Sequence, residues 1–210
     1  MERFLWYFQE GGILMYPLAL LSIVALAVIV ERAMRLRQNR LIDGALVEKV
    51  QEHIENNKLA EASVACKDNR TLLARVLDAA MKEFINTQTD METSLKESAE
   101  RELQVLWNNL GLLNTVARVA PLLGLLGTVF GMIGAFAVLS EAGVGKEEMA
   151  HQIRVALITT AAGLVIAIPV VLSEAYFRGR IRKIVAMYEA IFIDIVKSVK
   201  LALKARETQQ

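Results

Sequence analysis

The stretch VAPLLGLLGTVFGMIGAF, from Val119 to Phe136, decides the fold of this 210-residue chain. It contains no charged side chain, and the charge-free run that includes it covers 22 residues, from Val119 to Ser140. At about 1.5 Å per residue, a helix of this length reaches about 30 Å, the thickness of the hydrocarbon core of a bilayer. The sequence therefore predicts a transmembrane helix at this position.

Two further runs are also free of charge and long enough to cross a membrane. They are Gly11–Val30, with 20 residues, and Val155–Ser173, with 19. Hydrophobic residues make up 54% of the chain and charged residues 22%, and the mean hydropathy is +0.37. This balance argues against a soluble enzyme. We predict an all-α integral membrane protein with three transmembrane helices and long cytoplasmic helical extensions.

Basic residues cluster at one end of the first and third apolar runs. They are Arg32, Arg35, Arg37 and Arg40 after the first, and Arg178, Arg180, Arg182 and Lys183 after the third. The positive-inside rule places both of these ends in the cytoplasm, so the N-terminus is expected outside and the C-terminus inside. Residues 1–10 are net negative and no small-residue cleavage site follows the first run. We therefore interpret that run as a retained anchor and not as a signal peptide.

The predicted organisation follows from these runs. It comprises an outer-face segment (1–10), a first transmembrane helix (11–30), a cytoplasmic helical insert (31–110), a second transmembrane helix with its cytoplasmic entry (111–140), a periplasmic loop (141–154), a third transmembrane helix (155–177) and a cytoplasmic amphipathic tail helix (178–210). From about residue 41 to 110 there is no proline and one glycine, Gly44, which favours helix throughout.

Two apolar stripes at helical spacing extend beyond the membrane runs. The first comprises Leu95, Ala99, Leu103, Leu106, Leu110 and Leu113, and it predicts a helix that continues into the second span. The second comprises Ile181, Ile184, Val185, Tyr188, Ile191, Phe192, Ile195, Val196 and Val199. Each stripe is open to two interpretations, an intramolecular bundle or a subunit interface. The prolines Pro17, Pro121 and Pro169 are expected to end or kink helices.

Four glycines lie on one face of the second predicted span, since they are spaced by three, four and three residues. They are Gly124, Gly127, Gly131 and Gly134, and we call them the glycine face. A face of this kind allows another helix to approach closely. Together with Pro121, these are the predicted packing residues of the helix, and on spacing alone ordinary helix packing explains them.

Three hydroxyls, those of Thr128, Thr159 and Thr160, are candidates for holding water or passing a proton. The alternative is that each donates to a carbonyl of its own helix or of a neighbouring helix, as threonines in membranes commonly do. The interiors of all three spans contain no Asp, Glu, Lys, Arg or His. Because such groups usually mark ion pathways, a titrating group for ion transport must come from another protein.

Other kinds of site find no support in the sequence. Cys66 is the single cysteine, and His53 and His151 are isolated, so no disulfide or metal site is predicted. Glu31 and Glu174 lie at the cytoplasmic ends of spans, where hydration explains them. The phosphate-binding pattern GxxxxGK[ST], a nucleophile elbow, HExxH and CxxC are all missing. We expect no catalytic activity, no cofactor and no nucleic-acid binding.

The sequence resembles a known family in two long blocks. These are APLLGLLGTVFGMI, from Ala120 to Ile133, and ALITTAAGL, from Ala156 to Leu164, followed by Ala167, Ile168 and Pro169. They are similar to the MotA/TolQ/ExbB proton channel family, and most closely to its ExbB branch. The arrangement of a first span ending in Glu31 and Arg32, an insert of about 80 residues and two spans joined by a short loop is similar too, so the resemblance covers the whole chain.

The resemblance implies a homopentamer in the inner membrane of a Gram-negative bacterium, with the second and third spans lining a central pore. An ExbD-like single-span partner would occupy the pore and carry protons on an intramembrane Asp. Proton flow would then drive motion that a TonB-like protein uses to open outer-membrane transporters. By motif, Thr128 and Thr160 correspond to the pore-lining hydroxyls of the family, and Thr159 lies beside them.

One position departs from the family pattern. Close ExbB relatives often have a Glu five residues before the threonine of the third span, where this sequence has Val155. A TolQ-like motor for envelope constriction is the first alternative, and a non-conducting membrane scaffold is the second. A flagellar stator fits less well, because that branch has four spans and only three are found here.

Overall fold

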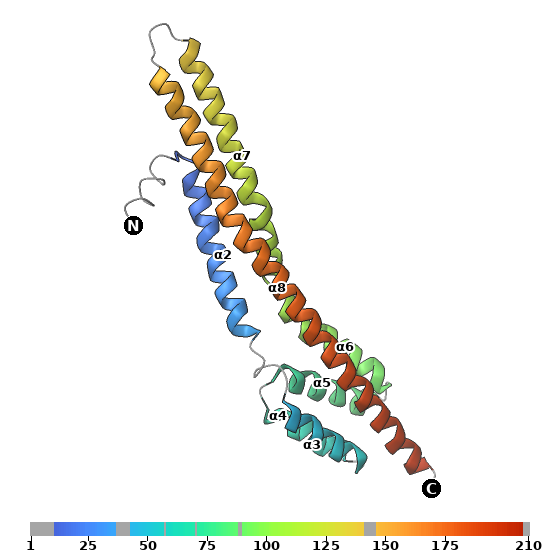
Figure 1. Ribbon diagram of the computed structural model, residues 1–210. Helices are drawn as coiled ribbons and strands as arrows, with labels where there is room; N and C mark the ends of the chain where they lie inside the picture. Colours follow the sequence, from blue (N-terminus) through green and yellow to red (C-terminus); the bar gives the residue numbers. More distant parts are fainter. Residues whose placement is uncertain are drawn as a thin grey trace. The chain divides into compact units, whose positions relative to one another are not determined.

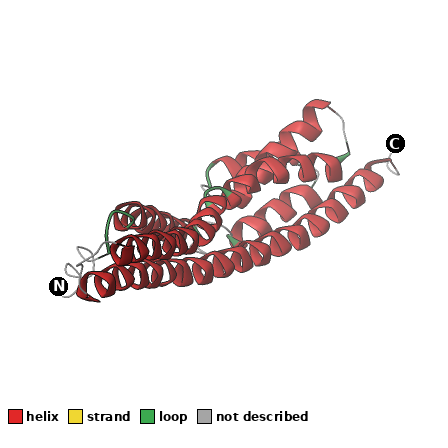
Figure 2. Ribbon diagram, turned by 90° about the horizontal axis from the view of Figure 1, so that it is seen from above, coloured by secondary structure: helices red, strands yellow, loops and turns green. Residues whose placement is uncertain are grey.

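The computed structural model describes residues 11–36, 43–56, 58–69, 71–87, 90–140 and 146–207. These residues form helices and connecting turns without any strand (Figure 2). The helices in Figure 1 are α2 (Met15–Arg35), α3 (Gly44–Glu55), α4 (Leu59–Lys67), α5 (Leu72–Thr87), α6 (Met91–Trp107), α7 (Leu110–Ser140) and α8 (Lys146–Glu207). The predicted outer-face segment, 1–10, lies outside the described residues, as do Arg37 and Arg40.

Three segments are long and apolar enough to cross a membrane: Met15–Arg35, Met91–Leu139, which comprises α6 and most of α7, and Lys146–Ala202. For the described residues, the prediction of an all-α chain with three helices long and apolar enough to span a membrane is therefore confirmed. The chain divides into two compact units. The first holds the described residues of 1–32 and 109–176, and the second those of 33–108 and 177–210.

In the first unit, α2 packs against α7 and α8 through small and aliphatic side chains. Met15 and Leu18 of α2 meet Ala120 of α7 and Ala167 of α8 in one buried cluster. The alanines are short enough to let three helices meet, because packing between membrane helices depends on close contact and not on exclusion of water. This cluster holds the three spanning segments together.

The prolines were expected to end or kink helices, and none of the three ends one; the kinks stay a prediction. Pro17 lies in the first turn of α2, whereas Pro121 and Pro169 lie inside α7 and α8. A proline in the first turn removes an N–H that has no helical partner in any case. Inside a membrane helix, neighbouring helices and side-chain hydroxyls compensate for the lost hydrogen bond.

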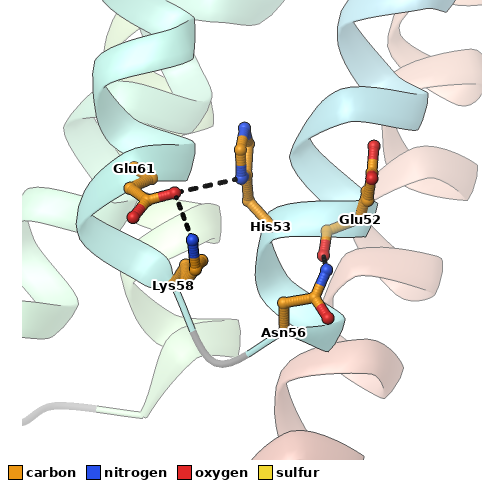
Figure 3. A network of polar contacts seen from close by, with 5 residues as sticks. All are labelled: Glu52, His53, Asn56, Lys58 and Glu61. Carbon is orange, nitrogen blue, oxygen red and sulfur yellow. Dashed lines mark hydrogen bonds and ion pairs between the residues drawn. The ribbon is translucent and has the colours of Figure 1, made fainter.

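In the second unit, helices that follow one another in the sequence contact each other: α3 contacts α4, α4 contacts α5, and α5 contacts α6. The side chains of Leu73, Leu77 and Met81 on α5 are fully buried. Figure 3 shows the polar connection between α3 and α4, where the Glu61 carboxylate lies 3.1 Å from Nζ of Lys58 and 3.6 Å from Nδ1 of His53.

Both predicted apolar stripes are buried within the chain itself. All six positions of the first stripe are buried, and so are seven of the nine in the second, Val185 and Ile191 being half-buried. The phenol of Tyr188 is hydrogen-bonded to the backbone of Leu73, and burial raises the pKa of Tyr188 well above its ordinary value. These contacts favour the intramolecular interpretation of the stripes.

The prediction that the first stripe lies on one continuous helix is wrong. α6 ends at Trp107 and α7 begins at Leu110, with a turn at Asn108 and Asn109 between them. Asn109 has a φ of 60°, a left-handed conformation that asparagine tolerates better than most residues.

The predicted loop 141–154 is shorter in the structure, since α8 already begins at Lys146. Glu147 and Glu148 lie in the first turn, where negative charge favours helix formation by interacting with the helix dipole. Residues 141–145 lie outside the described residues.

Candidate functional site

The glycine face of α7 packs directly on α8. A Cβ added to Gly124 would lie 3.0 Å from Cα of Thr160, and one added to Gly131 would lie 2.5 Å from Cβ of Ala156. Such distances leave no space for any side chain larger than hydrogen. The glycine face is therefore the surface by which α7 meets the following helix of the same chain.

The contact is matched by small residues on α8. A Cβ on Gly163 would lie 2.6 Å from the carbonyl oxygen of Ala120, and Gly134 faces the side-chain amide of Gln152. Pro121, next to Ala120, is half-buried. Sequence reasoning missed Gln152, Ala156 and Gly163 as packing partners. Gln152 and Ala156 are four residues apart, and Ala156 and Gly163 are seven apart, so all three lie on one face of α8. This helical spacing could have identified the face from the sequence.

Thr159 is a packing residue in this chain. It is 1% exposed, and its side chain covers the position where a Cβ of Gly127 would be. Its hydroxyl donates to carbonyls of its own helix, those of Val155 at 3.1 Å and Ala156 at 2.9 Å. Thr159 is therefore buried by the contact with α7, and its hydroxyl is hydrogen-bonded within α8.

Thr160 connects the two helices. Its hydroxyl donates to the carbonyl oxygen of Gly124 on α7 across 2.8 Å, and its side chain is half-buried. This interhelical bond is possible because Gly124 has no side chain to keep the two backbones apart.

Thr128 lies on α7 beside the glycine face. Its hydroxyl donates to the carbonyl oxygen of Leu125 in its own helix, at 2.6 Å, and its side chain is half-buried. A hydroxyl that donates one hydrogen bond can still accept from water. Thr128 and Thr160 are half-buried residues whose hydroxyls keep lone pairs for a further hydrogen bond, whereas Thr159 is buried.

Val155 occupies the position where close ExbB relatives often have a Glu, and it faces Gly12, which precedes α2. A Cβ on Gly12 would lie 3.3 Å from Cγ1 of Val155. Gly12 has a φ of +69°, which favours glycine, so both its conformation and this contact disfavour a side chain there. The valine fills an apolar contact and contributes no titratable group.

At the other end of the first unit, Glu31 receives a hydrogen bond from the Asn109 side chain at 2.8 Å and lies 3.5 Å from the Arg32 guanidinium. Glu31 thus joins the end of α2 to the turn that precedes α7. Among the described residues, no group of three or more His, Cys, Asp or Glu side chains is placed to hold a metal ion.

Residues 68–190 match the model of the MotA/TolQ/ExbB proton channel family, and this region includes the whole α7–α8 contact. The chain belongs to that family. Proteins of the family work with partner proteins in the membrane. The α7–α8 contact with its threonines is accordingly the candidate functional site of this MotA/TolQ/ExbB family member.

Relatives extend the similarity beyond the matched region. The chain is 33% identical over 175 residues to the ExbB-like biopolymer transport protein 1 of Synechocystis, with 79% of this chain and 67% of the relative covered. It is 30% identical over 177 residues to an ExbB homologue of Methanothermobacter thermautotrophicus, covering 83% and 62%. It is 32% identical over 186 residues to the Tol-Pal system protein TolQ of Haemophilus influenzae, covering 82% and 81%. The chain thus spans about two thirds of the length of the first two relatives.

Proposed function

We propose that this chain is the ExbB-like subunit of an inner-membrane motor driven by the proton-motive force. Five copies surround a pore lined by α7 and α8, with the N-terminus periplasmic and the C-terminus cytoplasmic. An ExbD-like partner in the pore supplies the titrating Asp, and a TonB-like protein passes the motion on to transport across the outer membrane. The chain itself acts without a cofactor and catalyses no reaction.

One observation carries this proposal. The chain belongs to a proton channel family, yet the interiors of its three apolar runs hold no Asp, Glu, Lys, Arg or His. Since a proton crossing the hydrocarbon needs a titratable group or water, the carboxylate has to come from a partner. The energy suffices without a nucleotide, because one charge crossing the membrane gains about 2.3 kcal/mol per 100 mV.

The threonines have different roles in this proposal. Thr128 and Thr160 are half-buried, and their hydroxyls keep lone pairs that can accept from pore water, so they line the path to the partner's Asp. Thr159 is buried against Gly127 and supports this surface from behind.

The substitution Thr160→Val tests the pathway. Valine keeps the size of the side chain but removes the hydroxyl, so we expect proton-driven work to be abolished while the complex still assembles. Thr115→Val is the matched control, because Thr115 donates to Gly111 of its own helix at the start of α7 and is exposed. Iron-chelate uptake and the native mass of the complex are measured together. Full activity of Thr160→Val would contradict the proposed pathway.

A TolQ-like motor for envelope constriction is the second candidate, and the similarity to the Haemophilus TolQ over 82% of this chain favours it. A loss-of-function strain of the host separates the two. Failure to grow on chelated iron supports the ExbB-like role, whereas detergent sensitivity and chained cells support the TolQ-like role. A phenotype insensitive to a protonophore would instead favour a non-conducting scaffold.

A further inference from the structure

The break between α6 and α7 consists of two residues, Asn108 and Asn109, which we call the helix junction. The apolar stripe does not change its spacing at this point. Buried leucines on both sides of the junction keep the three- and four-residue spacing of a single helix: Leu103, Leu106, Leu110 and Leu113. The junction itself contains neither proline nor glycine. The sequence is therefore compatible with one continuous helix as well as with two.

The backbone of the junction is extended at its first residue and left-handed at its second. Asn108 has a φ of −54° and a ψ of 148°, and Asn109 has a φ of 60°. The left-handed conformation is disfavoured for every residue with a Cβ, although asparagine tolerates it better than most. A continuous helix would place both residues in the right-handed conformation and remove this cost. The broken junction therefore depends on an interaction outside its own backbone.

That interaction comes from the cytoplasmic part of α2. Nδ2 of Asn109 donates to Oε2 of Glu31 across 2.8 Å, and Oε1 of the same carboxylate lies 3.5 Å from the guanidinium of Arg32. Arg32 is 2% exposed, so its side chain is held in place and fixes the carboxylate from the other side. Hydrogen bonds to a carboxylate are stronger than those between neutral groups. All three residues belong to the first unit.

We propose that the hydrogen bond between Asn109 and Glu31 is a conformational switch. While it is made, α6 and α7 are two helices; when it is broken, the helix junction becomes helical and the two join into one. In the joined state, the amides of Gly111 and Leu112 donate to the carbonyls of the preceding helical turn. The first spanning helix thus controls the backbone at the entry to α7. The switch goes beyond the proposed motor function, since it uses none of the threonine hydroxyls and no partner protein.

Hydrogen exchange of the full chain in nanodiscs of phosphatidylethanolamine and phosphatidylglycerol tests the switch. In the broken state, the N–H of Leu113 donates to the carbonyl oxygen of Asn109, and the N–H groups before it lie at the start of α7, where a helix offers them no partner of its own. We expect Glu31→Ala to slow exchange at Gly111 and Leu112 about tenfold, because helical amides exchange only when their hydrogen bonds open. A merely structural contact has the opposite sign, since its loss loosens the turn and speeds exchange.

Two matched variants show whether the junction is the cause. Glu31→Gln keeps a carbonyl oxygen within reach of Asn109, so its exchange should stay close to that of the wild type. The double variant Glu31→Ala with Asn109→Gly should also exchange like the wild type. Glycine adopts the left-handed conformation without a steric cost and is unfavourable inside a helix, so the junction stays broken even without the hydrogen bond.

Asn109→Ala breaks the same hydrogen bond from the other side and decides the matter if Glu31→Ala does not fold. Alanine has no side-chain donor, disfavours the left-handed conformation and has the highest helix propensity, so exchange at Gly111 and Leu112 should again be slower. Unchanged or faster exchange in the folded alanine variants overturns the proposal. Exchange as slow in the double variant as in Glu31→Ala overturns it too, because the effect would then not arise at the junction.

Discussion

Thr159 and Thr160 are consecutive residues of α8. Because an α-helix turns by about 100° per residue, their side chains lie in two different environments. Thr159 is buried against the glycine face and bonds to its own helix. Thr160 is half-buried and bonds to the carbonyl oxygen of Gly124 on the other helix. A single motif thus combines a packing residue with a hydroxyl that remains able to bind water.

The contact between Gly127 and Thr159 predicts a large effect of Gly127→Leu. The leucine side chain would overlap with Thr159, so α7 and α8 have to separate, at a cost of about 1–3 kcal/mol or more. The midpoint of thermal unfolding in detergent measures this loss. The matched control is Gly111→Leu on the same helix, because nothing lies within 4 Å of a Cβ at Gly111. Equal midpoints for the two variants would contradict the packing role.

The Cys66 thiol is expected to be unreactive in the folded protein. Burial, with a smaller contribution from the Asp78 carboxylate, raises the pKa of Cys66 from 9.0 to about 12. Since the thiolate is the nucleophile, iodoacetamide should modify the folded chain much more slowly at pH 8 than the denatured chain. Cys66 is the single cysteine, so the mass of the intact protein reports the reaction directly. Rapid modification of the folded chain would contradict the burial.

The same shift predicts how stability depends on pH. Above pH 9 the unfolded chain releases the thiol proton, whereas the folded chain keeps it until about pH 12. The unfolded state then binds fewer protons, so the free energy of unfolding should fall as the pH rises between these values. Replacing Cys66 with Ser should weaken this pH dependence, which denaturation at pH 8 and at pH 10.5 would measure.

At the scale of elements, the start of α3 is fixed by one side chain. Asp43 accepts hydrogen bonds from the Ala45 N–H at 3.1 Å and from the Asn69 side chain at 2.8 Å, so it caps α3 and connects it to the end of α4. Asp43→Ala should destabilise this region by about 1 kcal/mol. Hydrogen exchange of peptides from Gly44–Glu55 would measure the change.

The control for this capping prediction is Asp90→Ala. Asp90 occupies the corresponding position before α6, but its side chain makes no capping hydrogen bond. Hydrogen exchange of peptides from Met91–Trp107 should therefore be nearly the same in Asp90→Ala as in the wild type. If the two substitutions had equal effects on their own helices, the side-chain cap of Asp43 would not be the cause.

The elements also show what the sequence could and could not predict. The spanning segments and both apolar stripes follow from periodicity and charge, because burial of apolar side chains is what determines them. The turn at Asn109 could not be predicted, since it depends on a single left-handed residue and on the hydrogen bond from its side chain to Glu31, 78 positions away in the sequence. The residues of α8 that contact the glycine face could not be predicted either, because they depend on the register between α7 and α8.

At the scale of the whole molecule, the proposed function gives this chain only part of a proton path. The chain has candidate hydroxyls at Thr128 and Thr160 but no carboxylate within its apolar runs. Large apolar side chains such as Leu122, Phe136 and Val165 are exposed in the single chain. Both features are expected of one subunit in a larger assembly, where other chains cover apolar surface and supply the missing group.

The native mass of the gently extracted complex from its own host tests this directly. We expect five copies of the 23.3 kDa chain together with a small single-span protein that carries an intramembrane Asp. Such a partner would complete the path, because an Asp at the depth of Thr160 can take up and release the proton that no residue of this chain's spans can carry. A monomer or a symmetric dimer without this partner, even after crosslinking, would contradict the motor proposal and leave the glycines and threonines as packing residues alone.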